Sequence, residues 1–260
     1  RYELNPYHRK MTLQELCSFL SDCEIVIAGT EPLNREVLTH ASKLELIARV
    51  GTGIDNIDLD YLQKREIYLV TTPGEAAQSV AEFTLGLIVA LTRKIVASHT
   101  VLKRGQWERF YGMELQGKKL GIIGFGAIGQ KVALMAQAFG LSIQICDPYR
   151  VSLDPFSFVS LETLLQTSDI VSLHLPLTPE TFHLINAQRL ALMKKGAYLI
   201  NTARGSLLDE TALYHALKSE QLAGAALDVF SEEPYQGPLT QLPNVLLTAH
   251  MGGNSQEARI

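Results

Sequence analysis

The sequence has 260 residues, enough for two domains that each bury a hydrophobic core. With 23 basic and 27 acidic residues its formal net charge is −4, so it lacks the positive excess of proteins that bind nucleic acid. The longest apolar stretch, residues 85–91, is far shorter than the roughly 20 residues that span a bilayer, and we expect neither a membrane segment nor a signal peptide.

Cysteine usage indicates a reducing compartment. The three cysteines are odd in number, and none forms a Cys-x-x-Cys pair or a Cys/His spacing typical of a metal site. We therefore expect reduced cysteines, a cytoplasmic protein and no bound metal.

Helical and strand patterns alternate through the first 70 residues. Apolar residues at helical spacing alternate with short apolar runs, which predicts a small α/β unit. The predicted helices are residues 12–20, 34–41 and 59–65, and the predicted strands are 24–29, 44–50 and 67–70.

Pro73 and Gly74 break this pattern, and a second series of elements follows. Residues 75–101 predict one long helix that is buried or lies in an interface. A strand, helix and strand over 118–147 are then followed by more apolar runs and helical stretches, which predicts a doubly wound parallel sheet. The runs are 170–173, 197–200, 224–229 and 245–247, and the helical stretches are 161–166, 187–193 and 210–219.

A glycine motif lies between the first strand and helix of this second series. Gly124 permits a tight turn, Gly126 lets the backbone approach a pyrophosphate, and Gly129 lets the helix pack closely on the strand. Asp147 ends the next strand, at about the distance in sequence expected of a carboxylate that binds the adenosine ribose. Because free N–H groups at a helix N-terminus bind phosphate, the pattern predicts a site for NAD.

The motif begins more than a hundred residues into the chain, which predicts that the cofactor domain is inserted into another domain. We expect a substrate domain formed by residues 1–73 and 250–260, and an NAD-binding domain formed by residues 74–249. The predicted fold class is thus α/β, with two Rossmann-like, doubly wound parallel-sheet domains.

Three ionisable residues follow predicted strands, where open α/β sheets bind ligands. Arg204, Glu233 and His250 would be a cation for a carboxylate, a carboxylate to orient a histidine, and a proton carrier that titrates near neutrality. Taken singly, Arg204 is equally well a solvated loop cation, Glu233 a surface charge in a turn, and His250 a capping residue before Gly252 and Gly253.

Several segments together resemble the D-isomer specific 2-hydroxyacid dehydrogenases, most closely their phosphoglycerate-dehydrogenase-like branch. The likeness covers essentially the whole chain, and the order of its segments is specific. Besides the glycine turn with Asp147 they are residues 49–58 (RVGTGIDNID), 174–179 (HLPLTP), 201–205 (NTARG), 227–230 (LDVF) with 232–234 (EEP), and 250–253 (HMGG).

The resemblance implies roles for the residues of these segments. Arg204 would bind the 2-keto acid, His250 would be the acid/base, and Glu233 would hold His250. Backbone N–H groups of Val50, Gly51, Thr52 and Gly53 would grip the substrate carboxylate, with Arg49 beside them. The cofactor would be lined by Thr52, Gly124, Gly126, Ala127, Ile128, Gly129, Asp147, Leu175, Thr202, Ala203, Arg204, Asp228, His250, Gly252 and Gly253.

The implied activity is NAD-dependent interconversion of a 2-keto acid and its D-2-hydroxy acid. The alternative is an NAD-sensing, corepressor-like binding protein with the same fold and the same three residues. A formate dehydrogenase is disfavoured, because the branch of the family with that activity has a Gln where this chain has Glu233. The resemblance also suggests a homodimer through residues 75–101 and the segment around Trp107; the alternative is a helix packed inside a monomer.

The chain departs from the phosphoglycerate enzymes in one loop. Those enzymes usually carry an arginine after the first strand, where this chain has Ala28, Gly29 and Thr30, with Glu31 beside them. Arg49 is then the obvious cation near a substrate phosphate. We therefore expect small unphosphorylated acids, such as hydroxypyruvate or glyoxylate, to be turned over at least as efficiently as phosphohydroxypyruvate.

Overall fold

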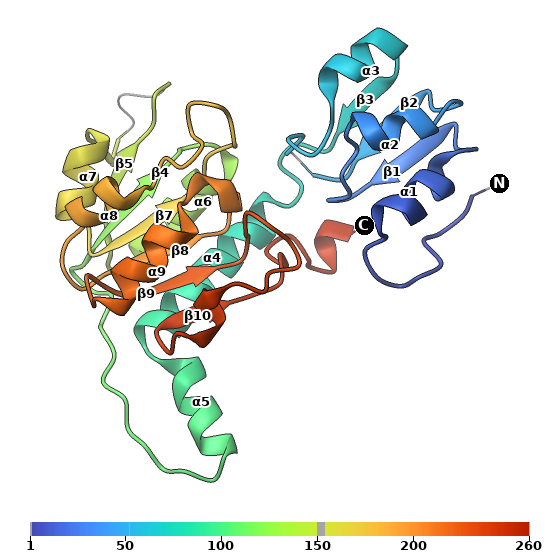
Figure 1. Ribbon diagram of the computed structural model, residues 1–260. Coiled ribbons are helices and arrows are strands. Elements are labelled where there is room, and N and C mark those ends of the chain that lie inside the picture. Colours follow the sequence, from blue (N-terminus) through green and yellow to red (C-terminus); the bar gives the residue numbers. More distant parts are fainter. Residues whose placement is uncertain (1, 52, 150–153, 260) are drawn as a thin grey trace. The chain divides into compact units, whose positions relative to one another are not determined.

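The computed structural model describes residues 2–51, 53–149 and 154–259, and contacts divide the chain into two units, Arg1–Glu75 and Ala76–Ile260 (Figure 1). This division lies close to the expected boundary after residue 73. Residues 250–260 are grouped with the second unit by their contacts, and their membership of a substrate domain stays a prediction.

The first unit is the small α/β unit that the sequence predicts. Its described residues form a parallel sheet in the order β1-β2-β3. A side chain at Thr12, Asn34 or Asp58 caps the start of each helix, which explains where the helices begin. The elements are α1 (Leu13–Leu20), β1 (Ile25–Ala28), α2 (Arg35–His40), β2 (Leu46–Arg49), α3 (Leu59–Arg65) and β3 (Tyr68–Thr71).

The second unit is built on a parallel sheet whose seven strands, within the described residues, lie in the order β10-β9-β8-β7-β4-β5-β6. The strands are β4 (Lys119–Ile123), β5 (Ser142–Cys146), β6 (Ser157–Phe158), β7 (Ile170–Leu173), β8 (Ala197–Asn201), β9 (Leu222–Leu227) and β10 (Val245–Leu247). The helices are α4 (Ala77–Thr92), α5 (Ile95–Lys103), α6 (Ala127–Ala138), α7 (Leu161–Thr167), α8 (Ala187–Leu192) and α9 (Glu210–Lys218).

Helices cover both faces of this sheet (Figure 1). One buried cluster joins α4 and α6 to residues such as Ile170 and Ile200, and the other joins α7, α8 and α9 to residues such as Val171 and Leu199. Successive residues of β7 and β8 therefore pack on opposite faces, and both strands are buried throughout. This explains why these strands are continuous apolar runs in the sequence.

The strand order reverses between β4 and β7. From β4 the chain continues to β5 and β6 on one side, and from β7 it continues to β8, β9 and β10 on the other. Ligands of doubly wound sheets bind at such a switch point, outside the carboxyl ends of the strands. The glycine turn after β4 and residues 174–175 after β7 both lie there.

The prediction of one long helix over residues 75–101 is wrong. The segment forms two helices, α4 and α5, which are separated at Arg93 and Lys94. Lys94 has a left-handed backbone with φ of 57°, and its ammonium lies 5.7 Å from the ring centre of Tyr198. Hydrophobic periodicity continues through this break, so the pattern alone cannot locate it.

Candidate active site

In the glycine turn after β4, two glycines lie in close contact with backbone carbonyl groups. Gly124 has φ of 93°, and a Cβ there would overlap the carbonyl oxygen of His174. A Cβ on Gly129 would overlap the carbonyl oxygen of Gly124, so both positions require glycine. Phe125 between them is fully buried, with its ring 5.4 Å from that of Phe156, and anchors the turn to the core.

The N-terminus of α6 fits a pyrophosphate group. Gly126 is its N-cap, and no side chain caps this end of the helix. A Cβ on Gly126 would meet no atom within 4 Å, so the space beside this residue is open; Ala127 and Ile128 follow it in the first turn. N–H groups of a first helical turn lack partners within the helix and bind anions.

Asp147 lies at the end of β5 and braces the same turn. Its carboxylate accepts hydrogen bonds from the N–H of Phe125 at 2.7 Å and from that of Tyr149 at 2.9 Å. These bonds hold a negative charge beside the glycine turn. A carboxylate that binds the adenosine ribose is expected at this place. Arg150, the nearest cation in the sequence, lies outside the described residues.

The loop after β7 closes the other side of the switch point. Leu175 is close to Gly124, since a Cβ on that glycine would lie 2.9 Å from a methyl group of Leu175. His174 Nε2 lies 2.9 Å from the hydroxyl of Ser172. Burial lowers the pKa of His174 to about 4, so its ring is neutral at neutral pH.

Arg204 is presented by a loop that Asn201 shapes. The buried Asn201 side chain donates to the carbonyl of Arg204 at 2.8 Å and accepts from the N–H of Ala203 at 3.0 Å. Thr202 Oγ1 lies 2.8 Å from Thr84 Oγ1 of α4, which fixes the loop to the helix. Arg204 itself is partly exposed, and its guanidinium donates to the carbonyl of Ala203 at 2.7 Å.

Asp228, which is 1% exposed, holds the turn that carries His250. Its carboxylate accepts from the Thr248 hydroxyl at 2.6 Å and from the N–H groups of Met251 and Gly252 at 2.9 and 2.8 Å. Its carbonyl accepts from the N–H of His250 at 2.8 Å. Since His250 has a left-handed backbone with φ of 51°, these bonds stabilise a conformation that non-glycine residues rarely adopt.

His250 and Glu233 form a close pair. The imidazole Nδ1 lies 2.9 Å from one carboxylate oxygen of Glu233 and 3.0 Å from the other. Glu233 also accepts from the N–H of Phe230 at 3.2 Å. With 33% and 24% of the two side chains exposed, the pair can be reached by a ligand. Because Nδ1 faces the carboxylate, Nε2 is the nitrogen that can exchange a proton.

In the first unit, Arg49 braces the loop that follows β2. The side chain is 7% exposed; its Nε donates to the carbonyl of Gly53 at 3.0 Å, and a terminal nitrogen donates to the carbonyl of Val50. The N–H of Val50 donates to the carbonyl of Ala28, and the N–H of Gly51 donates to the Thr72 hydroxyl. Two of the N–H groups expected at the substrate are thus bonded within this unit. Thr52 lies outside the described residues.

Several residues that hold the candidate site are not apparent from the sequence. Thr84, Ser172 and Thr248 have ordinary positions in the sequence, and only the fold brings them to the site residues. Asn201 lies in the segment 201–205, but nothing in the sequence indicates that its side chain shapes the Arg204 loop. Gly252 is buried, and a Cβ there would lie 3.1 Å from the Asp228 carboxylate. The position of Gly252 thus depends on the Asp228 turn, and its contact with a cofactor, like that of Gly253, stays a prediction.

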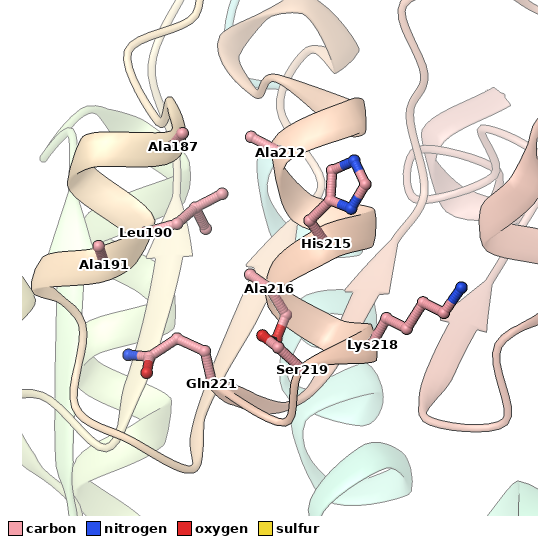
Figure 2. A pocket seen from close by; sticks show the side chains of 9 residues that line it. All are labelled: Ala187, Leu190, Ala191, Ala212, His215, Ala216, Lys218, Ser219 and Gln221. Carbon is pink, nitrogen blue, oxygen red and sulfur yellow. The ribbon is translucent and has the colours of Figure 1, made fainter.

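A groove of about 590 Å³ lies elsewhere in the second unit, between α8 and α9 (Figure 2). It is mainly apolar, and none of the predicted site residues lines it. The lining residues are Ala187, Leu190, Ala191, Ala212, His215, Ala216, Lys218, Ser219 and Gln221.

Nowhere in the described parts of the chain do three or more His, Cys, Asp or Glu side chains gather as metal ligands.

The chain is similar to known proteins over most of its length. The model of the family described as "D-isomer specific 2-hydroxyacid dehydrogenase, NAD binding domain" matches residues 85–252. The chain is 43% identical to the D-3-phosphoglycerate dehydrogenase of Methanocaldococcus jannaschii over 96% of its own length, but it spans only 49% of that protein. It is 40% identical to the hydroxypyruvate reductase of Thermotoga maritima, over 99% of this chain and 87% of the relative.

A solved structure is similar as well. The D-lactate dehydrogenase of Aquifex aeolicus, in complex with NAD and lactic acid, is 32% identical and superposes with a TM-score of 0.84. The match covers 94% of this chain and 80% of that one. A likeness at this level extends beyond the nucleotide-binding unit to nearly the whole chain.

Proposed function

Because this chain belongs to the D-isomer specific 2-hydroxyacid dehydrogenase family, we propose that it reduces a small 2-keto acid to its D-2-hydroxy acid with NADH, and catalyses the reverse oxidation with NAD. The observation that carries the proposal is the His250–Glu233 pair, with Nδ1 held 2.9 Å from the carboxylate. A merely solvated histidine would not need a carboxylate and a strained backbone to orient it.

Each residue has a defined task in this reaction. NADH, when bound, supplies a hydride to the carbonyl carbon of the 2-keto acid. Arg204 binds the carboxylate and carbonyl oxygens through its planar guanidinium, which suits pairs of oxygens. His250 donates a proton from Nε2 to the carbonyl oxygen, which completes the hydroxyl group, and takes it back in the oxidation. Glu233 holds the ring and balances the positive charge of the protonated imidazole.

The substrate we propose is unphosphorylated. The Arg49 guanidinium donates hydrogen bonds to the carbonyls of Gly53 and Val50, so these donors are used within its own loop and do not point to a phosphate site. In the neighbouring loop the Glu31 carboxylate accepts from the N–H of Gly29 at 2.7 Å, so that loop carries negative charge. A phosphate group needs two or more converging donors and is repelled by a carboxylate. Hydroxypyruvate and glyoxylate avoid this repulsion.

We also propose a homodimer in the cytoplasm. The residues of α5, all of them described, include none that is buried, and Ile95, Val96 and Leu102 are about half exposed. Trp107 and Tyr111 follow at 82% and 97% exposure, and together these side chains form an apolar surface typical of an interface.

The three cysteines are free, as in proteins of a reducing compartment. Within the described residues, no helix has the length and apolarity to cross a membrane.

Steady-state NADH oxidation tests the function directly. The acids to compare are hydroxypyruvate, glyoxylate, pyruvate and phosphohydroxypyruvate, with chiral analysis of the products. We expect D-hydroxy acids, and kcat/KM for hydroxypyruvate at least equal to that for phosphohydroxypyruvate. NAD binding without turnover of any acid would instead favour the corepressor-like alternative. A preference above about 10²-fold for the phosphorylated acid, roughly 2.7 kcal/mol, would contradict the substrate proposal.

A further inference from the structure

The first residue of α9 contacts the turn that carries Glu233. Glu210 Oε1 accepts two hydrogen bonds from Ser231, one from its N–H at 2.7 Å and one from its hydroxyl at 2.9 Å. Both donors bond the same oxygen. A carboxylate at a helix N-terminus is favoured by the helix dipole, and hydrogen bonds to an ionised acceptor are stronger than neutral ones. Glu210 is therefore a firm anchor for Ser231.

The position of Glu233 depends on the backbone next to Ser231. Glu233 accepts from the N–H of Phe230, the residue that precedes Ser231. The ring of Phe230 in turn stacks on that of Tyr235 at 4.4 Å, on the other side of the turn. Residues 230–235 thus form a compact turn, and Ser231 is where α9 holds it.

A second contact joins the same two segments. A Cβ on Gly205 would overlap the carbonyl carbon of Phe230 and the nitrogen of Ser231, so the two backbones touch at this point. Gly205 follows Arg204 directly and begins the short 3₁₀ helix Gly205–Leu207, which leads to α9. The stretch from Arg204 to Glu210 therefore contacts the Glu233 turn at both of its ends, once by packing and once by hydrogen bonds.

We propose that Glu210 is a positioning residue, which sets the place of Glu233 beside His250 by holding Ser231. Glu210 touches neither substrate nor cofactor in this account, and its effect on the reaction passes through Glu233. The inference rests on the proposed function for its kinetic consequence. Its structural consequence, the fixed geometry of the His250–Glu233 pair, does not depend on turnover.

Three variants measure the effect of this anchor. Glu210→Ala removes both bonds to Ser231, and we expect kcat for hydroxypyruvate reduction to fall roughly 5- to 20-fold, because small displacements of catalytic groups are costly. The dissociation constant of NADH should not change. Glu210→Gln should keep most of the activity, since one amide oxygen can accept both bonds. Glu36→Ala removes an exposed acidic residue from the first turn of α2 and should leave kcat unchanged.

A double-mutant cycle tests whether Glu210 acts through Glu233. In a Glu233→Ala background there is no carboxylate to position, so adding Glu210→Ala should lower kcat by less than twofold further. An additive loss would overturn the proposal, as would a Glu210→Ala single variant with wild-type kcat.

A spectroscopic readout separates this inference from the proposed function. The ¹⁵N resonances of the His250 ring, assigned with His250→Ala, should shift in Glu210→Ala and stay in place in Glu210→Gln and Glu36→Ala. If the wild-type protein reduced none of the acids, the proposed function would fail while this comparison still tested the anchor. Ring resonances of Glu210→Ala that match the wild type would overturn the inference.

Discussion

Asp147 should determine which dinucleotide the protein prefers. Its carboxylate is fixed beside the glycine turn by two N–H groups, so it cannot easily turn away from a ligand there. A carboxylate suits two ribose hydroxyls and repels a 2′-phosphate, at a cost on the order of several kcal/mol. We expect kcat/KM to be much higher with NADH than with NADPH, and Asp147→Ser to reduce the difference. Equal efficiency of the wild-type protein with both cofactors would show that Asp147 does not meet the ribose.

At single residues, the sequence indicates candidate ligand-binding side chains better than it shows what holds them. Arg204, Glu233 and His250 stand out as candidates because each follows an apolar run that ends at the edge where such sheets bind ligands, and their contact with a ligand stays a prediction. The bonds of Asp228 to Thr248, and of Thr202 to Thr84, could not, because these residues are far apart in the chain and meet only in the fold. Asp228 was predicted to line the cofactor, which stays a prediction; the structure shows that its carboxylate holds the His250 turn.

Among the elements, the connection from β8 to α9 is held by close packing at Gly205. A methyl group there would overlap the backbone of Phe230 and Ser231, which is not a flexible side chain that can move aside. We expect Gly205→Ala to lower the free energy of unfolding by about 2–3 kcal/mol and to lower kcat, because it separates the Arg204 loop from the Glu233 turn. Chemical denaturation and steady-state kinetics measure the two effects.

Gly196→Ala is the matched control for this substitution. Gly196 precedes β8 and has φ of 80°, but a Cβ there would meet no atom within 4 Å. The control should therefore cost only the strain of a left-handed alanine, about 1 kcal/mol, with no change in kcat. Equal losses of stability and activity in the two variants would show that the contact with Phe230 has no role in positioning.

Element types were easier to predict than element ends. The predicted starts of α7 and α9, at residues 161 and 210, agree with the structure, where the side chains of Ser160 and Asp209 cap them, whereas α1 begins one residue later than predicted. The break between α4 and α5 was missed because apolar spacing continues across it. The two-residue strand β6 was missed because it is too short to show a period.

For the whole molecule, the exposed apolar surface of α5 and its following segment should mediate self-association. Changing Trp107, which is 82% exposed, to Glu would place a charge in such an interface. We expect a dimer for the wild-type protein and a shift toward monomer for Trp107→Glu in sedimentation velocity experiments. Tyr149→Glu, at another 92% exposed aromatic residue, is the control and should remain a dimer. A wild-type protein that sediments as a monomer would contradict the proposed dimer through the α5 surface.

The account as a whole depends on proton donation by His250 during the reduction of a 2-keto acid. The most direct measurement mixes the preformed NADH complex rapidly with hydroxypyruvate and compares wild type with His250→Ala. NADH affinity, from fluorescence titration, should agree within about twofold, because the glycine turn is untouched. The rate of NADH oxidation should fall by about 10²–10⁴-fold, equivalent to roughly 3–5 kcal/mol of barrier. A variant that keeps most of the wild-type rate would contradict the account.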